Sequence, residues 1–186
     1  MRHVISALVM NEPGVLANVA GMFAARGFNI DSLVVGRTDN PDLSRMTIVA
    51  SADDNTLDQV RKQLAKLVPV VEVHDFEGSA YIERDLVLVA VPVAADRRGE
   101  VIHIVDLFRG KVVDIAPDSL TAELSGTEEK LVAFIEMLRP YGIKELARTG
   151  VIAMSRGMQH GTDKGTATVK RTRSINAPAA AALPPS

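Results

Sequence analysis

The feature that most constrains the fold of this chain is an order of strands and helices that occurs twice. Between Val4 and Val73, apolar periodicity predicts the order strand, helix, strand, strand, helix, strand. The same order returns between Leu86 and Ala147. Because this βαββαβ order is typical of a ferredoxin-like domain, we predict an α+β chain with two such domains, each with both helices on one face of an antiparallel sheet.

Turn and breaker residues divide the first copy into its elements. Strands are expected at Val4 to Met10, Phe28 to Gly36, Met46 to Ser51 and Val70 to Val73. One helix is expected from the Pro13-Gly14 turn to about Ala25, with Gly27 as its C-terminal stop. A second helix begins after Asp53, whose short acidic side chain is suited to capping.

The second copy is expected to repeat these elements with a shorter hairpin. Its strands are predicted at Leu86 to Val91, Lys111 to Ala116, Leu120 to Leu124 and Ile143 to Ala147, with Val151 to Met154 as a candidate continuation of the last. Its helices are predicted around Val101 to Phe108 and after Thr127. We therefore predict domains at residues 1–78 and 79–157, and a mobile tail at 158–186, which has few core-forming residues.

The two copies also match in letters, and their differences point to function. Arg26 to Asp31 aligns with Arg109 to Asp114, and the shared Arg-Gly pair indicates a helix stop in both copies. Three features of the first copy are missing from the second. In the alignment of the two copies, Asn11 corresponds to Ala94 and Asn29 to Val112. The Pro13-Gly14 turn corresponds to Asp96-Arg97. Residues present in one copy only are the candidates for a binding site.

The segment from Asn11 to Leu16 has the chemistry of an anion site. Pro13 suits the first turn of a helix because it lacks an N–H group, and Gly14 has no Cβ, so a ligand can approach its backbone. The free N–H groups at a helix start attract a carboxylate, and Asn29 offers a carboxamide to an ammonium or carboxylate. The alternatives are a helix cap for Asn11 and an ordinary tight turn for Pro13-Gly14.

Composition narrows the possible functions further. The chain has 186 residues, 47% hydrophobic residues, a net charge of −2 and no cysteine, so we expect neither a nucleic-acid partner nor thiolate chemistry. No signal peptide or membrane span is apparent, and we expect a cytoplasmic location. Catalytic motifs are missing, and the four histidines have no metal-ligand spacing. We therefore predict neither catalytic residues nor a metal site.

Several segments resemble one family, in order and across both copies. They are Asn11-Glu12-Pro13-Gly14-Val15-Leu16, Arg26 to Leu33, Leu43 to Val49, Phe108 to Asp114 and Ala147 to Gly157. Together they closely resemble the small subunit of acetohydroxyacid (acetolactate) synthase. The resemblance implies that the first domain is an ACT domain, a ferredoxin-like amino-acid sensor.

The resemblance further implies a regulatory subunit without independent activity. Such a subunit activates a catalytic (large) subunit and confers feedback inhibition by valine in branched-chain amino-acid biosynthesis, the route to valine and isoleucine. Thiamine diphosphate, FAD and magnesium then belong to the catalytic partner, and this chain forms a homodimer through its ACT domains. Valine would lie between two protomers, bound by Asn11, Pro13, Gly14, Val15 and Leu16 of one and Asn29 and Ile30 of the other.

Two other functions remain possible on the residues alone. A stand-alone enzyme would need a nucleophile with its base, or a metal cluster, and the sequence has neither pattern. An amino-acid-responsive transcription factor would need a DNA-binding module, and no helix-turn-helix segment is left over.

Overall fold

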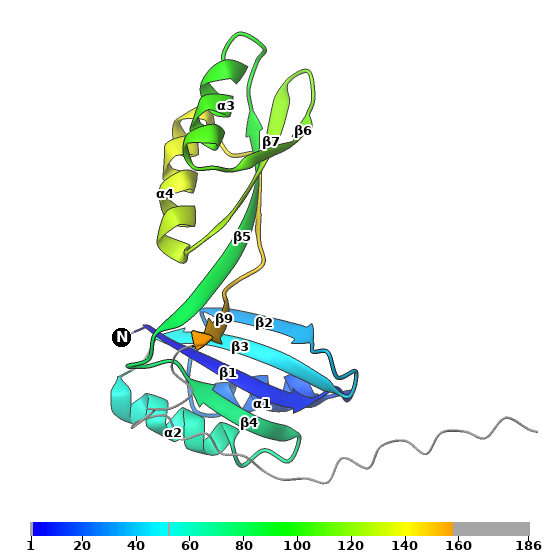
Figure 1. The fold of residues 1–186 in the computed structure, drawn as a ribbon, viewed down its shortest axis with the longest axis vertical. Helices are drawn as coiled ribbons and strands as arrows, with labels where there is room; N and C mark the ends of the chain where they lie inside the picture. The colour runs from blue at the N-terminus through cyan, green and yellow to red at the C-terminus, as the bar shows by residue number, and fades with distance from the viewer. Residues whose placement is uncertain (1, 52, 158–186) are drawn as a thin grey trace, which may run out of the picture.

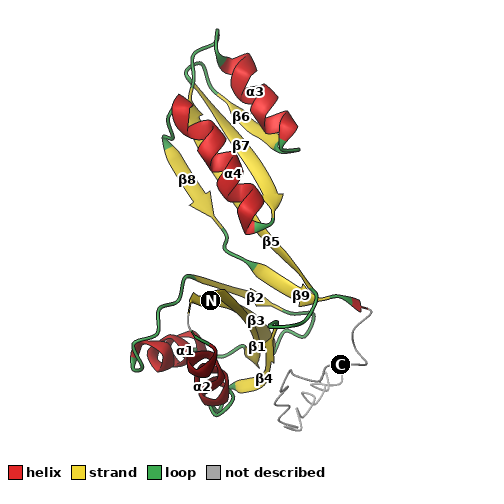
Figure 2. Ribbon diagram, turned by 90° about the vertical axis from the view of Figure 1, so that its left-hand side faces the viewer, coloured by secondary structure: helices red, strands yellow, loops and turns green. Residues whose placement is uncertain are grey.

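The computed structural model describes residues 2–51 and 53–157 of the chain. These residues form two antiparallel sheets, each with two helices packed on one face, stacked along the long axis of the molecule (Figures 1 and 2). One long strand, β5(Tyr81–Pro92), starts beside the first sheet and continues as a central strand of the second (Figure 1). The predicted α+β fold with two ferredoxin-like units is therefore confirmed. The predicted tail at 158–186 lies outside the described residues.

The first unit has the predicted element order. Its elements are β1(Arg2–Met10), α1(Val15–Ala24), β2(Ser32–Arg37), β3(Leu43–Ser51), α2(Asp54–Leu64) and β4(Val70–Asp75). The strand order is β2-β3-β1-β4, so β1 and β3 are central and β2 and β4 are the edges. The β1 and β3 strands pair over their whole length, from Arg2 opposite Ser51 to Met10 opposite Leu43. Strand β3 begins at Leu43, earlier than the predicted Met46.

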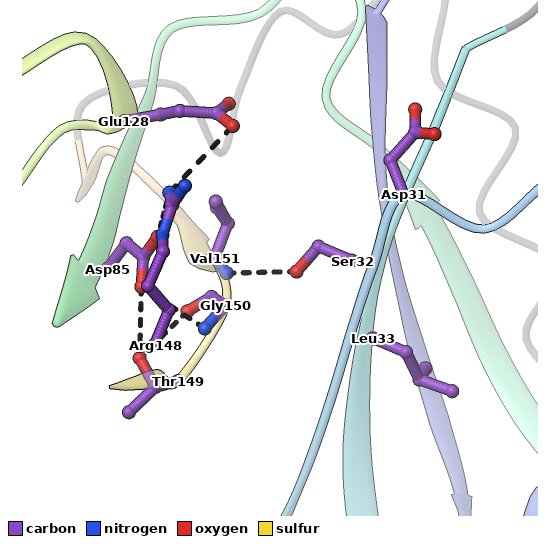
Figure 3. A pocket seen from close by; sticks show the side chains of 9 residues that line it. All are labelled: Asp31, Ser32, Leu33, Asp85, Glu128, Arg148, Thr149, Gly150 and Val151. Carbon is purple, nitrogen blue, oxygen red and sulfur yellow. Dashed lines mark hydrogen bonds and ion pairs between the residues drawn. The ribbon is translucent and has the colours of Figure 1, made fainter. Parts of the chain in front are cut away.

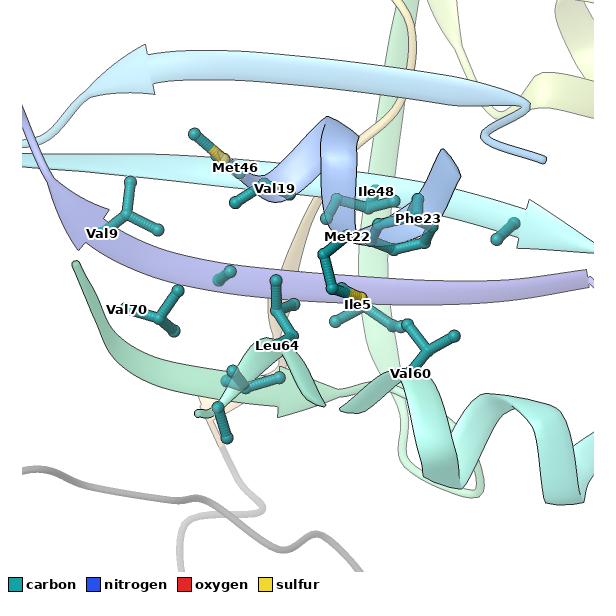
Figure 4. Close-up of a cluster of buried hydrophobic side chains, with 14 of the residues drawn as sticks. Ile5, Val9, Val19, Met22, Phe23, Met46, Ile48, Val60, Leu64 and Val70 are labelled. Carbon is teal, nitrogen blue, oxygen red and sulfur yellow. The ribbon is translucent and has the colours of Figure 1, made fainter. Parts of the chain in front are cut away.

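The core of this unit follows from the alternation of side chains along the strands. Ile5, Ala7 and Val9 of β1 point to the helices and are fully buried. They meet Phe23 of α1 and Leu64 of α2 in one apolar cluster (Figure 4). Burying each large side chain of this kind is worth about 1.5–3 kcal/mol, so this cluster fixes the helices against the sheet.

The ends of the helices are fixed by the residues that the sequence predicts. Asp53 caps α2, because its carboxylate accepts a hydrogen bond from the Thr56 N–H at 2.8 Å. After α1, Gly27 is left-handed with φ 68°, and the Phe28 N–H donates to the Phe23 carbonyl at 3.1 Å. These are the features of a Schellman motif with glycine at its left-handed position, so the predicted stop at Gly27 is confirmed.

The second unit repeats the order with one addition. After β5 its elements are α3(Arg98–Leu107), β6(Lys111–Ile115), β7(Ser119–Gly126), α4(Glu128–Leu138), the 3₁₀ turn η1(Arg139–Tyr141), β8(Glu145–Arg148) and β9(Ile152–Ser155). The strand order is β6-β7-β5-β8. Val87, Val89 and Val91 of β5 form its core with α3 and α4.

Strand β9 is not a continuation of β8, which corrects the expectation for Val151 to Met154. It pairs with the first part of β5, with Ile82 opposite Met154, whereas β8 pairs with the later part of β5. Strand β5 therefore begins at Tyr81 rather than at the predicted Leu86. The resulting two-stranded ribbon covers part of the first sheet, where Val151 and Ala153 are buried among Val4, Val49 and Phe76. Long-range packing of this kind is not visible in local periodicity.

The structure also corrects the alignment of the two copies. The second copy has the same Schellman motif, but its left-handed residue is Arg109 with φ 56°, and the strand follows after Gly110 alone. A Cβ on Gly110 would lie 2.9 Å from the Glu123 carbonyl oxygen, which explains that glycine. In the first copy, residues 28–31 separate Gly27 from β2. Residues 29–31 are therefore an insertion without a counterpart.

The expectation that Asn29 lies in a strand is consequently wrong. The strand was predicted from Phe28, but β2 begins at Ser32. The Asn29 carboxamide instead donates to the Asp31 carboxylate at 2.8 Å. Local hydrogen bonds of Asn and Asp side chains compete with strand pairing, and Phe28 and Ile30 still pack against the core.

Candidate functional site

The start of α1 is open in the way that the sequence predicts. Gly14 occupies the N-cap position in a left-handed conformation, with φ 84° and ψ −10°, so glycine is favoured there by the backbone itself. Space within 4 Å of a Cβ built on Gly14 is empty. Val15 is buried, whereas Leu16 is 46% exposed. The Val15 N–H donates to the Glu12 carbonyl at 3.4 Å. The N–H groups that follow it have no partner inside the helix before Asn18, whose N–H donates to the Gly14 carbonyl at 2.9 Å, so they are the donors that an anion can reach.

Asn11 anchors this loop to the hairpin between β2 and β3 rather than capping the helix. Its carboxamide Nδ2 donates to the Pro41 carbonyl at 3.0 Å, and its Oδ1 accepts from the Ser44 hydroxyl at 3.2 Å. The Asn11 N–H also donates to the Asp42 carbonyl at 2.8 Å. One Nδ2 hydrogen remains for a ligand. The three bonds of Asn11 therefore hold the loop in place without using the N–H groups of α1.

The equivalent position in the second copy is closed. The N-cap of α3 is Arg97, with a right-handed conformation and φ −100°. Its guanidinium bonds Glu100 at 3.3 Å and lies 4.9 Å above the Tyr141 ring. The start of α3 therefore carries the Arg97 guanidinium, held by Glu100 and Tyr141, where α1 has an open glycine. This contrast supports the inference that the open start of α1 is a specialised feature.

Asn29 and Ile30 lie at the opposite end of the first sheet. Next to them the Asp31 N–H donates to the Val49 carbonyl at 2.8 Å, and Asp31 accepts from the Ser51 hydroxyl at 2.7 Å. Asn11 is bonded to Asp42, before the first residue of β3. At about 3.3 Å per strand residue, the seven steps from Asp42 to Val49 separate these two groups by roughly 23 Å. One chain thus does not bring the two predicted halves of the site together.

A cleft that sequence reasoning missed lies between the two units. It has a volume of about 300 Å³ and is lined by β2, the start of α4 and the connection from β8 to β9 (Figure 3). Asp85 at its wall is 2% exposed. Its carboxylate accepts from both Nε and Nη2 of Arg148, from the Thr149 hydroxyl at 3.1 Å and from the Gly150 N–H at 3.1 Å. The one sign of this cleft in the sequence is the acidic Asp85 directly before the apolar run that begins at Leu86.

Two further ion pairs link the units beside this cleft. Arg2 of β1 lies 2.8 Å from Glu128 at the start of α4 and 3.1 Å from Glu83 of β5. Burial lowers the pKa of the Arg2 guanidinium, but the charges of Glu83 and Glu128 outweigh it, so the pKa lies above its usual value. Arg2 is therefore a fixed positive charge between the units.

Other kinds of site find little support in the part of the chain that the structure describes. There, no group of three or more His, Cys, Asp or Glu side chains is placed to hold a metal ion. Likewise, none of the described helices is both long and apolar enough to cross a membrane.

Comparison with known families assigns both units. Residues 5–72 match the family described as the AHAS small subunit-like ACT domain. Residues 84–157 match the family described as the small subunit of acetolactate synthase. The two matches lie in order along the chain and together cover both ferredoxin-like units.

Individual relatives agree over nearly their full length. A probable acetolactate synthase small subunit from Methanothermobacter thermautotrophicus is 51% identical over 156 residues, which is 83% of this chain and 93% of that protein. The acetolactate synthase small subunit of Mycolicibacterium smegmatis is 50% identical over 83% of this chain and 92% of its own length. The crystal structure of the small subunit from Thermotoga maritima superimposes with a TM-score of 0.78 at 40% identity, over 84% of this chain and 98% of that one.

Proposed function

The chain belongs to the acetolactate synthase small subunit family, and on that premise we propose that it activates the catalytic subunit of that enzyme and makes it sensitive to valine. It would thereby regulate branched-chain amino-acid biosynthesis, the route to valine and isoleucine, in the cytoplasm. A catalytic large subunit is the partner that membership of this family implies. Thiamine diphosphate, FAD and magnesium belong to that partner in this proposal, and the small subunit has no turnover of its own.

The observation that carries the proposal is the pair of features unique to the first unit. These are the open helix start at Gly14 and the three-residue insertion that contains Asn29 and Ile30. Because they lie at opposite ends of one sheet, a ligand can touch both only across two chains. The valine site therefore requires a homodimer of ACT domains.

The position of β2 makes such a dimer reasonable. Strand β2 is an edge strand that pairs only with β3 among the described strands, and Val35 on it is 43% exposed. Antiparallel pairing of two β2 strands would place the end of one beside the start of the other. The end of β2 leads to the hairpin that holds Asn11, and its start follows Asn29. Such pairing would bring the two halves of the site together.

The chemistry of the combined site suits a small amino acid. The helix-start N–H groups near Gly14 and Val15 would receive the carboxylate, and Asn11 and Asn29 would hold the polar end. Leu16 and Ile30 would contact a short branched side chain. Because one methylene in an apolar pocket is worth only ~1–3 kcal/mol, leucine and isoleucine would be excluded incompletely.

A valine titration of the complex with the catalytic subunit tests the proposal. We expect the small subunit to raise acetolactate formation from pyruvate and valine to lower it again, while the small subunit alone forms none. A complex whose rate is independent of the small subunit would overturn activation, and a rate independent of valine would overturn sensing. Turnover of pyruvate by the purified chain alone would overturn the assignment as a regulatory subunit.

A further inference from the structure

The connection between β8 and β9 is held at both ends by different units. On the side of the second unit, Asp85 binds Arg148, Thr149 and Gly150 in succession, so one buried carboxylate organises the whole turn. Thr149 is bonded to Leu86 as well: the Leu86 N–H donates to its hydroxyl at 3.1 Å, and its own N–H donates to the Leu86 carbonyl at 3.0 Å. The turn therefore has little freedom relative to β5.

On the side of the first unit, the same turn touches the start of β2. The Val151 N–H donates to the Ser32 hydroxyl at 3.2 Å (Figure 3). Gly150 is left-handed with φ 89°, and a Cβ on it would lie 2.5 Å from the Ser32 Oγ and 2.9 Å from a methyl group of Val34. The two units are thus in contact at a point where only a glycine fits.

This contact lies directly after the insertion of the first unit. Asn29 is bonded to Asp31, and Ser32 is the next residue. On the other side of the turn, Arg148 lies 3.8 Å from Glu128, which begins α4 and is also paired with Arg2 at 2.8 Å. Hydrogen bonds, ion pairs and the chain itself therefore connect Asn29, through the turn, to the first residue of α4 in the second unit.

We propose that Asp85 with its partners Arg148, Thr149 and Gly150 is a rigid joint that sets the orientation of the second unit relative to the ACT domain. The hydrogen bond between Ser32 and Val151 attaches this joint to the ACT domain. A displacement of residues 29–31 moves Ser32 and, through its hydrogen bond, the turn. Because the bonds of Asp85 keep the turn from changing its own conformation, the movement reaches α4. The joint itself follows from the geometry of one chain. Its use in regulation rests on the proposed valine site.

The joint can be tested without any effector. Since the chain has no cysteine, spin labels can be placed on the exposed positions of Lys66→Cys in the first unit and Asp106→Cys in the second. We expect a narrow distance distribution between the labels by pulsed electron resonance. Ser32→Ala and Arg148→Gln should each broaden or shift it. Distributions that coincide with that of the parent chain in both variants would overturn the joint.

Matched variants separate this effect from a general loss of contacts. Ser119→Ala removes a serine hydroxyl that donates to its neighbour Asp118 at 3.4 Å, within the second unit. Arg139→Gln removes a two-pronged pair with Glu136, at 2.6 and 2.9 Å, that stays within the second unit. Both should leave the label distances unchanged. Ser32→Ala deletes one oxygen atom outside both cores, so it decides the matter even if Arg148→Gln does not fold.

The regulatory role has a separate readout in the complex with the catalytic subunit. With Arg148→Gln or Ser32→Ala we expect valine to bind with unchanged affinity by calorimetry, while inhibition at saturating valine is reduced. Inhibition that persists in both variants would overturn the transmission, and so would a loss that only follows weakened binding. If the parent complex does not bind valine, the proposed function fails, and the label distances still decide whether the joint exists.

Discussion

The buried carboxylate of Asp85 gives the most quantitative prediction, through the variant Asp85→Asn. The side chain of Asp85 has no exposed surface, and that of Arg148 is 29% exposed. Asparagine keeps the shape and one oxygen that can accept from Thr149 and Gly150. It replaces the other oxygen with an NH₂ group. This group and the guanidinium of Arg148 are both hydrogen-bond donors, so they cannot bond to each other.

The expected cost follows from these contacts. Breaking a buried ion pair from one side costs about 3–5 kcal/mol, because the other charge is left without a partner. Arg148 reaches solvent and keeps Glu128 at 3.8 Å, so the lower end applies. We expect a loss of about 3 kcal/mol, set by the lost charge-assisted hydrogen bonds. With a urea m-value of about 1–3 kcal/mol/M, this shifts the unfolding midpoint down by roughly 1–3 M.

The measurement is urea unfolding of the full chain, followed by circular dichroism. The double variant Asp85→Asn, Arg148→Gln should be less destabilised than the sum of its two single variants, because they remove the same interaction. A midpoint for Asp85→Asn within experimental error of the parent chain would refute the reasoning, since Asp85 would then contribute no net stability.

The remaining predictions concern the effector site and a glycine of the joint. Gly14→Asp should abolish the valine response and leave activation of the catalytic subunit largely intact. The control Gly14→Asn also tolerates a left-handed backbone but adds no charge, so it should retain more of the valine response. Unchanged valine binding by Gly14→Asp in calorimetry would contradict the site. Asn29→His should desensitise the complex through the partner protomer, which a valine titration of the rate checks. Gly150→Ala should destabilise the chain more than Gly27→Ala. Both changes cost about 1–2 kcal/mol of backbone strain, but only the new Cβ at position 150 would also clash with Ser32 and Val34. Equal urea midpoints would refute this.

Much of the fold was predictable because the elements of each unit depend on residues that are close together in the sequence. An apolar run that ends at Asn11 placed β1, and the capping side chain of Asp53 and the stop at Gly27 bounded the helices. The errors are at positions where distant partners decide. The segment from Phe28 to Gly36 is predicted as one strand, but Phe28 and Ile30 pack on the core from an irregular segment before β2.

The candidate effector residues stay a prediction from the sequence, in which the second copy serves as an internal control for Asn11, Pro13-Gly14 and Asn29. The contrast between Gly14 and Arg97 survives in the structure as an open and a closed helix start. The alignment of Asn29 with Val112 was wrong, because the similar residues on either side hid the insertion of residues 29–31. Asp85 was not identified, because its partners are some 63 to 65 residues away in the chain.

The sequence by itself determined the two βαββαβ units, their cores and the features peculiar to the first, because these depend on periodicity, capping and backbone preference within a few residues. The tertiary structure alone decided that β5 extends from the second sheet to the side of the first, that β9 packs on the first sheet, and that Asp85 and Ser32 hold the turn between them. Such contacts depend on where whole elements lie relative to one another. Burial of apolar surface and satisfaction of buried polar groups select that arrangement only once both units have formed.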